Sequence, residues 1–240
     1  MPNSLALVFA HPDDETFATG GTLARYAAAG VPWDLFCATD GDAGKSSVPV
    51  ASREALGALR REELRRAAHH LGVREIDCAG HPDGALGGVD FDQLVGEIVA
   101  FLRRVRPAVV LTFGPEGAPT GHRDHKAISR AATAAFFLSG LRTAYPDAGA
   151  AHAPRRLYYV TWPTPAPDAE LQREGLPAAA VIDVRDCLPV KREAFLLHAT
   201  QRQHEARFME LGMTETERFA LASGAAQPRE IVDDLFAGLG

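Results

Sequence analysis

The chain has 240 residues, of which 46% are apolar and 23% charged, and its formal net charge is −6. These values suit one large α/β domain, so we treat residues 1–240 as a single domain with a loop-rich segment at about 142–180. The negative charge argues against a nucleic-acid-binding protein, which would present a basic face.

Two further absences bear on location. No uninterrupted apolar run reaches the roughly 18 residues of a transmembrane helix, and the N-terminus lacks the basic start of a signal peptide. Three widely spaced cysteines, Cys37, Cys78 and Cys187, form no C-x-x-C pair. We therefore expect reduced core thiols and a cytoplasmic protein without a membrane partner.

The first predicted element is a buried strand at 5–9, and the run His-Pro-Asp-Asp-Glu follows it at 11–15. At the carboxyl end of a strand in an open α/β sheet, such residues lie where ligands usually bind. His11 and Asp14 are of ligand type and have a tight spacing that suits a divalent metal, while Asp13 can point elsewhere. The alternative is that one of the two aspartates caps the next helix. Capping does not account for the histidine.

Strands and helices then alternate along the chain. A helix over 22–29 that ends at Gly30 and a strand at 33–38 complete a βαβ unit. A dinucleotide-binding protein would need G-x-G-x-x-G after the first strand, so nicotinamide chemistry is not expected. The remaining predicted helices are 52–71, 91–105, 126–138 and one near 189–203, and the remaining strands are 75–79, 108–113, 157–161 and a last short one at 181–184. We expect a long loop or flap at 163–177 and helical or irregular structure at 217–219 and 231–236.

A second cluster, Gly-His-Arg-Asp-His at 121–125, follows the predicted strand at 108–113 and a Gly/Pro loop. In a parallel sheet both clusters lie at the same edge. This brings together His11, Asp14 and His125, a set of two histidines and a carboxylate that is known from catalytic zinc sites. The same ligands suit Fe(II) or another divalent ion.

The other residues of the clusters suit acid–base work. A divalent cation lowers the pKa of water that it binds from about 15.7 to about 7, and Asp13 is placed to act as general base on that water. Asp124 is expected to hydrogen-bond a ring nitrogen and so orient a histidine. His122 would stabilise an oxyanion or protonate a leaving amine. The alternative for His122 is an ordinary surface histidine.

Taken together, several stretches resemble the PIG-L/LmbE-like family of zinc deacetylases. They are the first cluster with Ala10, then Thr-Asp-Gly-Asp at 39–42, Arg60 with Glu63 and Leu71-Gly72, His-Arg-Asp-His at 122–125 and, more weakly, His-Ala-Thr-Gln at 198–201. Members of that family remove the acetyl group from N-acetylglucosaminyl conjugates. The resemblance implies an α/β fold with a Rossmann-like, mostly parallel sheet and helices on both faces. It also implies Zn²⁺ and a small N-acetylated amino-sugar conjugate as partner, and we expect a homo-oligomer.

The resemblance also assigns roles residue by residue. It implies zinc ligation by His11, Asp14 and His125, a general base in Asp13, stabilisation of the tetrahedral intermediate by His122 and orientation of a histidine by Asp124. It further implies substrate contacts for Arg60, Asp83 and Asp42.

Within the family, residues 51–56 and 60–64 are similar to the bacillithiol-pathway branch, which deacetylates N-acetylglucosaminyl malate. Arg123 stands where many members have proline, and Thr120 where the mycothiol branch has tyrosine. Arg53 and Arg60 are about two helical turns apart and could share a face, and arginine pairs bidentately with carboxylates such as those of malate. The alternative is that both arginines pair with Glu54 and Glu63 on a solvated face.

Other functions stay open from the sequence alone. One is a catalytically silent metal- or sugar-binding protein, although pure binding would need neither Asp13 nor His122. Another is a deacetylase of a different N-acetylated sugar conjugate. A metallophosphoesterase would usually need more carboxylate ligands and a second metal.

Overall fold

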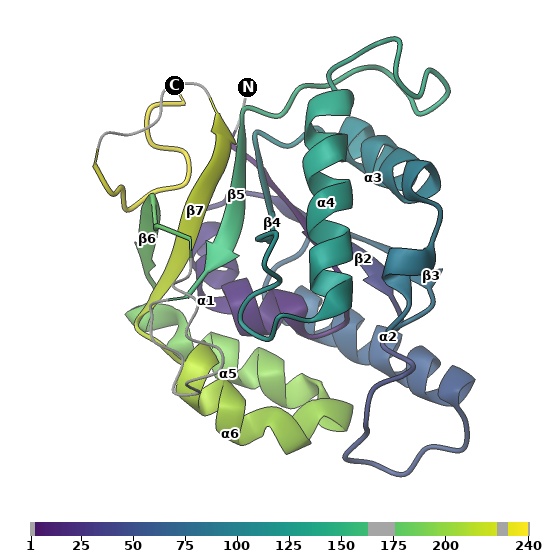
Figure 1. Cartoon of the computed structure of the whole chain (residues 1–240). Helices are drawn as coiled ribbons and strands as arrows, with labels where there is room; N and C mark the ends of the chain where they lie inside the picture. The colour runs from purple at the N-terminus through teal and green to yellow at the C-terminus, as the bar shows by residue number, and fades with distance from the viewer. Residues whose placement is uncertain (1–2, 163–175, 225–229, 240) are drawn as a thin grey trace.

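The computed structural model describes residues 3–162, 176–224 and 230–239 (Figure 1). Within these residues, seven strands form one sheet in the order β3-β2-β1-β4-β5-β7-β6. Strands β3, β2, β1, β4 and β5 are parallel, and β7 runs antiparallel to β5 and β6. The strands are β1 Leu5–Phe9, β2 Trp33–Thr39, β3 Glu75–His81, β4 Val109–Phe113, β5 Arg156–Thr161, β6 Ala180–Asp183 and β7 Thr216–Gly224.

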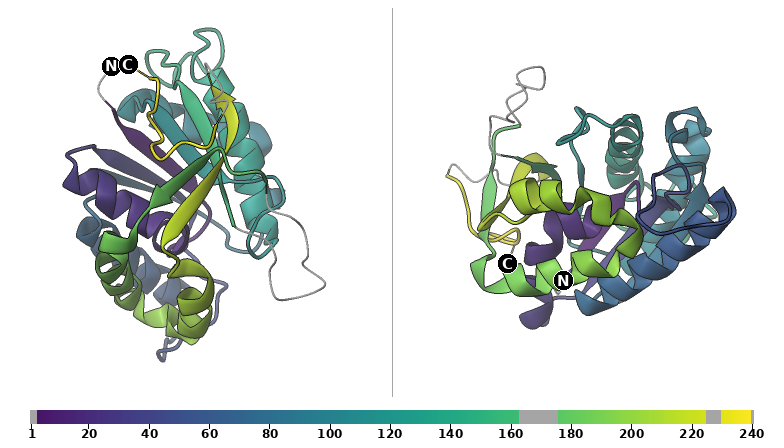
Figure 2. Two further views of the ribbon diagram at one scale, coloured as in Figure 1. Left: turned by 90° about the vertical axis from the view of Figure 1, so that its left-hand side faces the viewer. Right: turned by 90° about the horizontal axis from the view of Figure 1, so that it is seen from below.

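Helices cover both faces of the sheet, so the predicted fold class is confirmed. Helices α3 and α4 pack together on one face, and α1, α2 and α5 lie on the other (Figure 2). The α-helices are α1 Asp14–Ala28, α2 Arg53–His70, α3 Phe91–Val105, α4 Arg123–Leu138, α5 Leu188–Leu197 and the short α6 Glu205–Arg207. The short 3₁₀ turns are η1 Leu86–Gly88, η3 Arg185–Cys187 and η4 Ala199–His204, and η5 Phe208–Gly212 is a π-helical turn. Among the described residues, no helix has the length and apolar character needed to cross a bilayer.

The central strands explain why the site lies where it does. Every residue of β1, β2 and β4 is buried. A strand that helices cover on both faces needs apolar side chains at nearly all positions, which is why these runs stand out in the sequence. The polar residues of the two clusters therefore follow the strands, and Asp34 near the start of β2 is an exception that pairs with Arg74.

Helix α1 begins at Asp14, much earlier than the predicted start at 22. Gly20 and Gly21 lie inside the helix. A Cβ on Gly20 would lie 2.9 Å from Cγ of Lys191, and one on Gly21 would lie 2.6 Å from Cβ of Val184. The two glycines thus permit close packing in mid-helix and do not precede the helix.

The C-terminal part differs most from the prediction. Residues 217–219, expected to be helical or irregular, lie inside strand β7, so the strand at 181–184 is not the last. The predicted helix near 189–203 ends at Leu197 and continues as a 3₁₀ turn. The segment 231–236 is irregular, with an isolated bridge between Val232 and Ala180. Most of the predicted flap at 163–177 lies outside the described residues.

The three cysteines are free, as expected. Cys37 is fully buried, whereas Cys78 and Cys187 are partly exposed. They are therefore not all core thiols.

Candidate metal centre and active site

The loops that follow β1, β3 and β4 meet at one cavity. His11, Asp13 and Asp14 follow β1, and Asp83 follows β3. His122 and His125 enter from the start of α4, beyond β4, and also line the cavity. The two sequence clusters are thus brought together at one sheet edge.

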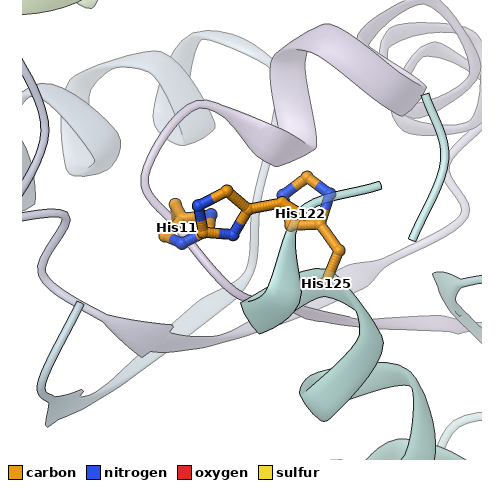
Figure 3. Close-up of side chains that lie close together, drawn as sticks. All are labelled: His11, His122 and His125. Atoms are coloured by element: carbon orange, nitrogen blue, oxygen red, sulfur yellow. The ribbon is translucent and has the colours of Figure 1, made fainter. Parts of the chain in front are cut away.

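Three histidines that line this cavity lie close together (Figure 3). His11 comes from the loop after β1, while His122 and His125 lie one helical turn apart at the start of α4. One nitrogen of each ring lies within 4.8 Å of the other two. The ring of Phe113 stacks on His125 with the centroids 3.9 Å apart, which fixes the plane of that imidazole.

Asp14 lies between two of these histidines. Its Oδ1 is 3.3 Å from Nε2 of His125 and its Oδ2 is 3.5 Å from Nδ1 of His11. Burial raises the pKa of Asp14, but His125 and then His11 outweigh burial and hold that pKa well below its usual value. The carboxylate is therefore an anion placed between two imidazoles, and the predicted ligands His11, Asp14 and His125 lie in contact.

The alternative role of the two aspartates as helix caps is wrong. The Asp13 side chain makes no capping hydrogen bond although Asp13 is the N-cap residue of α1. Asp14 Oδ2 instead accepts the backbone N–H groups of Ala10 and His11, at 3.2 and 2.8 Å. Both carboxylates remain directed at the cavity, whose lining includes them.

Asp13 is held beside a buried arginine. Its Oδ2 lies 3.3 Å from Nη2 of Arg60, which also donates to the carbonyl of Pro12 at 2.5 Å. Nη1 of Arg60 donates to the carbonyl of Gly41 at 2.8 Å. Burial raises the pKa of Asp13 to about 6, against the opposing charge of Arg60. Asp13 is thus a stronger base than an exposed aspartate.

Asp124 is fully buried and hydrogen-bonds a ring nitrogen, that of His11. Its Oδ2 is 3.4 Å from Nε2 of His11 and accepts the Gly84 N–H at 2.6 Å, and its Oδ1 accepts the Leu86 N–H at 3.1 Å. Asp83 approaches the same histidine nitrogen, at 3.2 Å from Oδ1. Asp83, for which the resemblance implies a substrate contact, therefore lies among the possible metal donors with His11 and Asp124.

The ring of His122 has a defined hydrogen-bonding state. Nδ1 accepts the backbone N–H of Asp124 at 3.2 Å and so caps helix α4. Burial lowers the pKa of His122, and the charges of His11 and His125 lower it further. A neutral imidazole that accepts at Nδ1 carries its proton on Nε2. His122 is thereby left with one free N–H donor.

Of the remaining predicted substrate residues, Arg60 lies at the cavity, whereas Arg53 and Asp42 lie apart from it. The Arg53 side chain is 60% exposed and pairs with Asp42 at 2.9 Å, and neither residue lines the cavity. Arg60 lines it and is buried. Arg53 is the first residue of α2. It precedes Arg60 by seven residues, which corresponds to about 10 Å along the helix axis. Only Arg60 of the two arginines lines the cavity, and substrate contacts by Arg53, Arg60 and Asp42 stay predictions.

Sequence reasoning missed several residues around the site. Glu15 and His198, both buried, form an ion pair behind Asp13. His204 and Arg207 line the outer part of the cavity and are exposed. Glu15 stands in the first cluster, and the weak resemblance at 198–201 includes His198, but an isolated histidine with no nearby acid gives no spacing that indicates its partner.

The donor set fits a divalent cation. Imidazole nitrogens and carboxylate oxygens are the ligands that Zn²⁺ and Fe²⁺ take in proteins. Four carboxylates, those of Asp13, Asp14, Asp83 and Asp124, lie among the three imidazoles. Besides burial, the charge of Asp14 raises the pKa of Asp13, and a cation would offset that repulsion. Nδ1 of His125 is also buried without a hydrogen-bond partner among the described residues.

Comparison of the sequence with known proteins gives a matching family model and similar individual proteins. The family model "PIG-L: GlcNAc-PI de-N-acetylase" matches residues 6–136. A 1D-myo-inositol 2-acetamido-2-deoxy-alpha-D-glucopyranoside deacetylase of Rhodococcus jostii is 34% identical over 288 residues, with 98% of each chain covered. A probable N-acetyl-alpha-D-glucosaminyl L-malate deacetylase 2 of Bacillus cereus is 35% identical over 133 residues, which cover 55% of this chain and 60% of the relative.

Solved structures share the fold. N,N'-diacetylchitobiose deacetylase from Pyrococcus horikoshii has a TM-score of 0.73 at 20% identity, over 91% of this chain and 83% of that one. The 4-carboxy-2-hydroxymuconate hydratase GalB from Pseudomonas putida has a TM-score of 0.75 at 16% identity, over 95% and 99%. Because one is a deacetylase and the other a hydratase, the reaction has to be argued from the site and not from the fold.

Proposed function

The chain belongs to the PIG-L family, and from that premise we propose that it is a metal-dependent deacetylase of an N-acetylglucosaminyl conjugate. The observation that carries the proposal is the position of Asp13. It lies next to the donor Asp14 in the chain, lines the same cavity as His11 and His125, and carries a raised pKa. A protein that only bound metal would not need this additional base.

We assign His11, Asp14 and His125 as the residues that hold the cation, with zinc or another divalent ion such as Fe²⁺ as its identity. When bound, such a cation lowers the pKa of a water molecule and polarises the acetyl carbonyl. Asp124, and Asp83 with it, keeps the His11 ring oriented through Nε2.

Asp13 is the general base of the proposed reaction. A group with a pKa of about 6 is mostly ionised at neutral pH and still takes up a proton more readily than an ordinary aspartate. Asp13 accepts a proton from the attacking water while the water oxygen bonds to the acetyl carbon. The proton then passes to the amide nitrogen as the C–N bond breaks, which yields acetate and the free amine.

His122 stabilises the oxyanion that forms during this attack. A neutral ring with its proton on Nε2 can donate one hydrogen bond but has no second proton to give to an amine. The hydrogen bond and the lowered pKa therefore favour the first of the two roles considered for this residue. Removal of one such donor typically costs about 10²–10³-fold in kcat.

The aglycone is a separate question. Relatives that align over 98% of this chain are named for an inositol conjugate, so we take that conjugate as the first candidate. The malate conjugate expected from the sequence is the second. One observation favours it: Arg207 is an exposed cation that lines the cavity, where it suits an anionic aglycone.

The test is acetate release from the inositol conjugate, the malate conjugate and free N-acetylglucosamine, assayed side by side. We expect turnover of at least one conjugate with a kcat/KM well above that of the free sugar. A metal-loaded protein that releases acetate from none of them would be a silent binding protein or a deacetylase of a different N-acetylated sugar conjugate. Two metal ions per chain would instead favour a metallophosphoesterase.

Asp13→Asn provides the matched variant. Asparagine keeps the shape of the side chain but cannot take up the proton, so we expect activity to fall about 10²–10⁴-fold while metal content stays near wild type. Metal content is measured after gel filtration. Loss of the metal together with activity would make Asp13 a ligand and not the base.

A further inference from the structure

The proposed base has an unusual backbone conformation. Asp13 has φ 110° and ψ −22°, and it is one of three non-glycine residues with positive φ in the described part of the chain. Such a conformation is strained for any residue with a Cβ and persists only where the surroundings enforce it. The contacts of the Asp13 backbone therefore matter to where its carboxylate points.

Glu15 makes the contact to the Asp13 amide. The Glu15 side chain is buried, and its Oε2 accepts the backbone N–H of Asp13 at 3.1 Å. Its Oε1 accepts from the hydroxyl of Thr16 at 2.6 Å and from Nε2 of His198 at 3.0 Å. Both carboxylate oxygens of Glu15 therefore accept hydrogen bonds, and one of these bonds comes from the strained residue Asp13.

His198 joins this group from a distant part of the chain. It follows α5 directly, lies 183 positions from Glu15 and is completely buried. Nδ1 of His198 has no partner among the described residues, so the polar contacts of the ring all lie on Nε2, toward Glu15 and Thr16. Burial of an imidazole costs free energy unless its ring nitrogens form hydrogen bonds. The hydrogen bond to Glu15 offsets this cost for His198.

The segment that carries His198 is itself fixed to α2. Thr200 donates its backbone N–H and its hydroxyl to the two oxygens of Glu63, at 3.0 and 2.6 Å. Glu63 lies three residues after Arg60, which holds the Asp13 carboxylate from the opposite side. Helix α2 and the turn after α5 therefore enclose the base together.

We propose that Glu15 and His198 are positioning residues that hold Asp13 in its strained backbone conformation and thereby direct its carboxylate at the reacting water. Neither residue lines the cavity, so both act through Asp13 and do not touch substrate. The proposal rests on the proposed function, in which Asp13 is the base. Misplacement of a catalytic group by about 1 Å costs on the order of 100-fold in rate.

The test compares His198→Leu with His198→Gln. Leucine removes the donor to Glu15, whereas the glutamine amide can still donate from a similar position. We expect His198→Leu to lower kcat about 10- to 100-fold with KM and metal content near wild type, and His198→Gln to recover most of that loss. His152→Leu is the matched control, because His152 is also buried and bonds a carbonyl, that of Pro107. It should lower the melting temperature without changing kcat.

A second measurement does not depend on catalysis. Hydrogen exchange of the Asp13 amide, followed by NMR, reports the bond to Glu15 directly, and we expect faster exchange in His198→Leu than in wild type or His152→Leu. Unchanged exchange and a kcat within about two-fold of wild type in His198→Leu would overturn the proposal. If that variant fails to fold, Glu15→Ala removes the acceptor of the Asp13 N–H, and Asp13 exchange as slow as in wild type would then overturn the proposal. Absence of acetate release by the wild type would contradict the proposed function and leave the exchange result to decide the positioning role.

Discussion

His11 is the residue on which the candidate site depends most. Its Nδ1 faces Asp14, and its Nε2 faces Asp83 and Asp124. Burial alone would lower the pKa of His11, yet the bond to Asp124 and then those to Asp14 and Asp83 raise it well above its usual value. A metal-free site would thus hold a proton on His11 that a cation would have to displace, since imidazole ligates in its neutral form.

The assigned ligands and the cluster of three histidines share His11 and His125, and they differ in whether the third ligand is Asp14 or His122. We expect His125→Ala to lose its metal, because two protein ligands do not make a stable zinc site. His122→Ala should keep a stoichiometric metal while kcat falls, because we assign His122 as the oxyanion donor. Metal content after gel filtration separates the two outcomes. His204→Ala, which changes a cavity histidine outside both sets, is the control and should retain the metal.

One combination of results would contradict the assignment of Asp14 as the third metal ligand. Loss of metal in His122→Ala, with retention in Asp14→Asn, would show three histidine ligands. In that case the oxyanion would need another donor, and Asp14 would serve to orient His11 and His125.

At the scale of single residues, the sequence predicts which residues close together in the chain share the site. It misses contacts between residues that are far apart in the chain. His11, Asp13 and Asp14 stand within four positions, and His125 follows a strand that can be recognised, so their proximity follows from a parallel sheet. His198 is 183 positions from Glu15 and has no acid near it in the sequence, so nothing local indicates the pair. Arg53 shows a different limit, because helical spacing indicates that Arg53 and Arg60 share a face but not how far along the helix the cavity extends.

The interaction between β7 and α1 shows why strand β7 was not predicted from the sequence. Glu217 on β7 accepts the backbone N–H groups of Gly21 and Thr22, at 2.9 and 2.8 Å, in the middle of α1. Lys191 on α5 pairs with the same carboxylate at 2.6 Å, and both side chains are buried. A charged residue at a strand position argues against a buried strand unless its partner is known. That partner lies 26 positions away on a helix, so β7 could not be recognised.

This buried pair gives a stability prediction. Lys191→Met removes the cation and leaves the Glu217 carboxylate uncompensated, which should lower the free energy of unfolding by about 3–5 kcal/mol. Adding Glu217→Gln should recover part of the loss, since the amide is neutral and its oxygen can still accept one backbone N–H. Urea unfolding of the two single variants and the double variant measures the coupling.

The control for this cycle is an exposed pair. Arg104 lies 2.8 Å from both Glu75 and Asp77, with each side chain well exposed. Arg104→Gln should change the free energy of unfolding by at most about 1 kcal/mol. Additive effects of Lys191→Met and Glu217→Gln would mean that the two buried side chains stabilise the fold independently.

The sheet order accounts for the position of the site in the whole molecule. Strand β1 lies between β2 and β4, so the chain order reverses beside the strand that carries the first cluster. Ligand sites of open α/β sheets lie outside the carboxyl ends of the strands at such a reversal. The predicted α/β class and its two clusters were sufficient to locate the site there. The homo-oligomer and the cytoplasmic location stay predictions.

Because the donors come from segments that are far apart in the chain, metal binding should stabilise the fold as a whole. The loop after β1 supplies His11 and Asp14, and α4 supplies His125, and these segments meet only in the folded protein. A ligand that binds only the folded state stabilises it by about 2.7 kcal/mol at a hundredfold excess over Kd. For a domain of this size about 1 kcal/mol shifts Tm by roughly 2–4 °C. We therefore expect Zn²⁺ to raise the Tm of metal-free protein by about 5–11 °C.

Two variants test whether the rise in Tm with Zn²⁺ arises from binding at the candidate metal centre. Asp13→Asn keeps all three assigned ligands, so its Tm should rise with Zn²⁺ as in wild type, and a chelator should reverse the rise. His125→Ala removes the one ligand that links α4 to the loop after β1, so its Tm should respond little. An undiminished shift in His125→Ala would place the stabilising metal elsewhere, and the link between strand-end clusters and metal binding would then have to be abandoned.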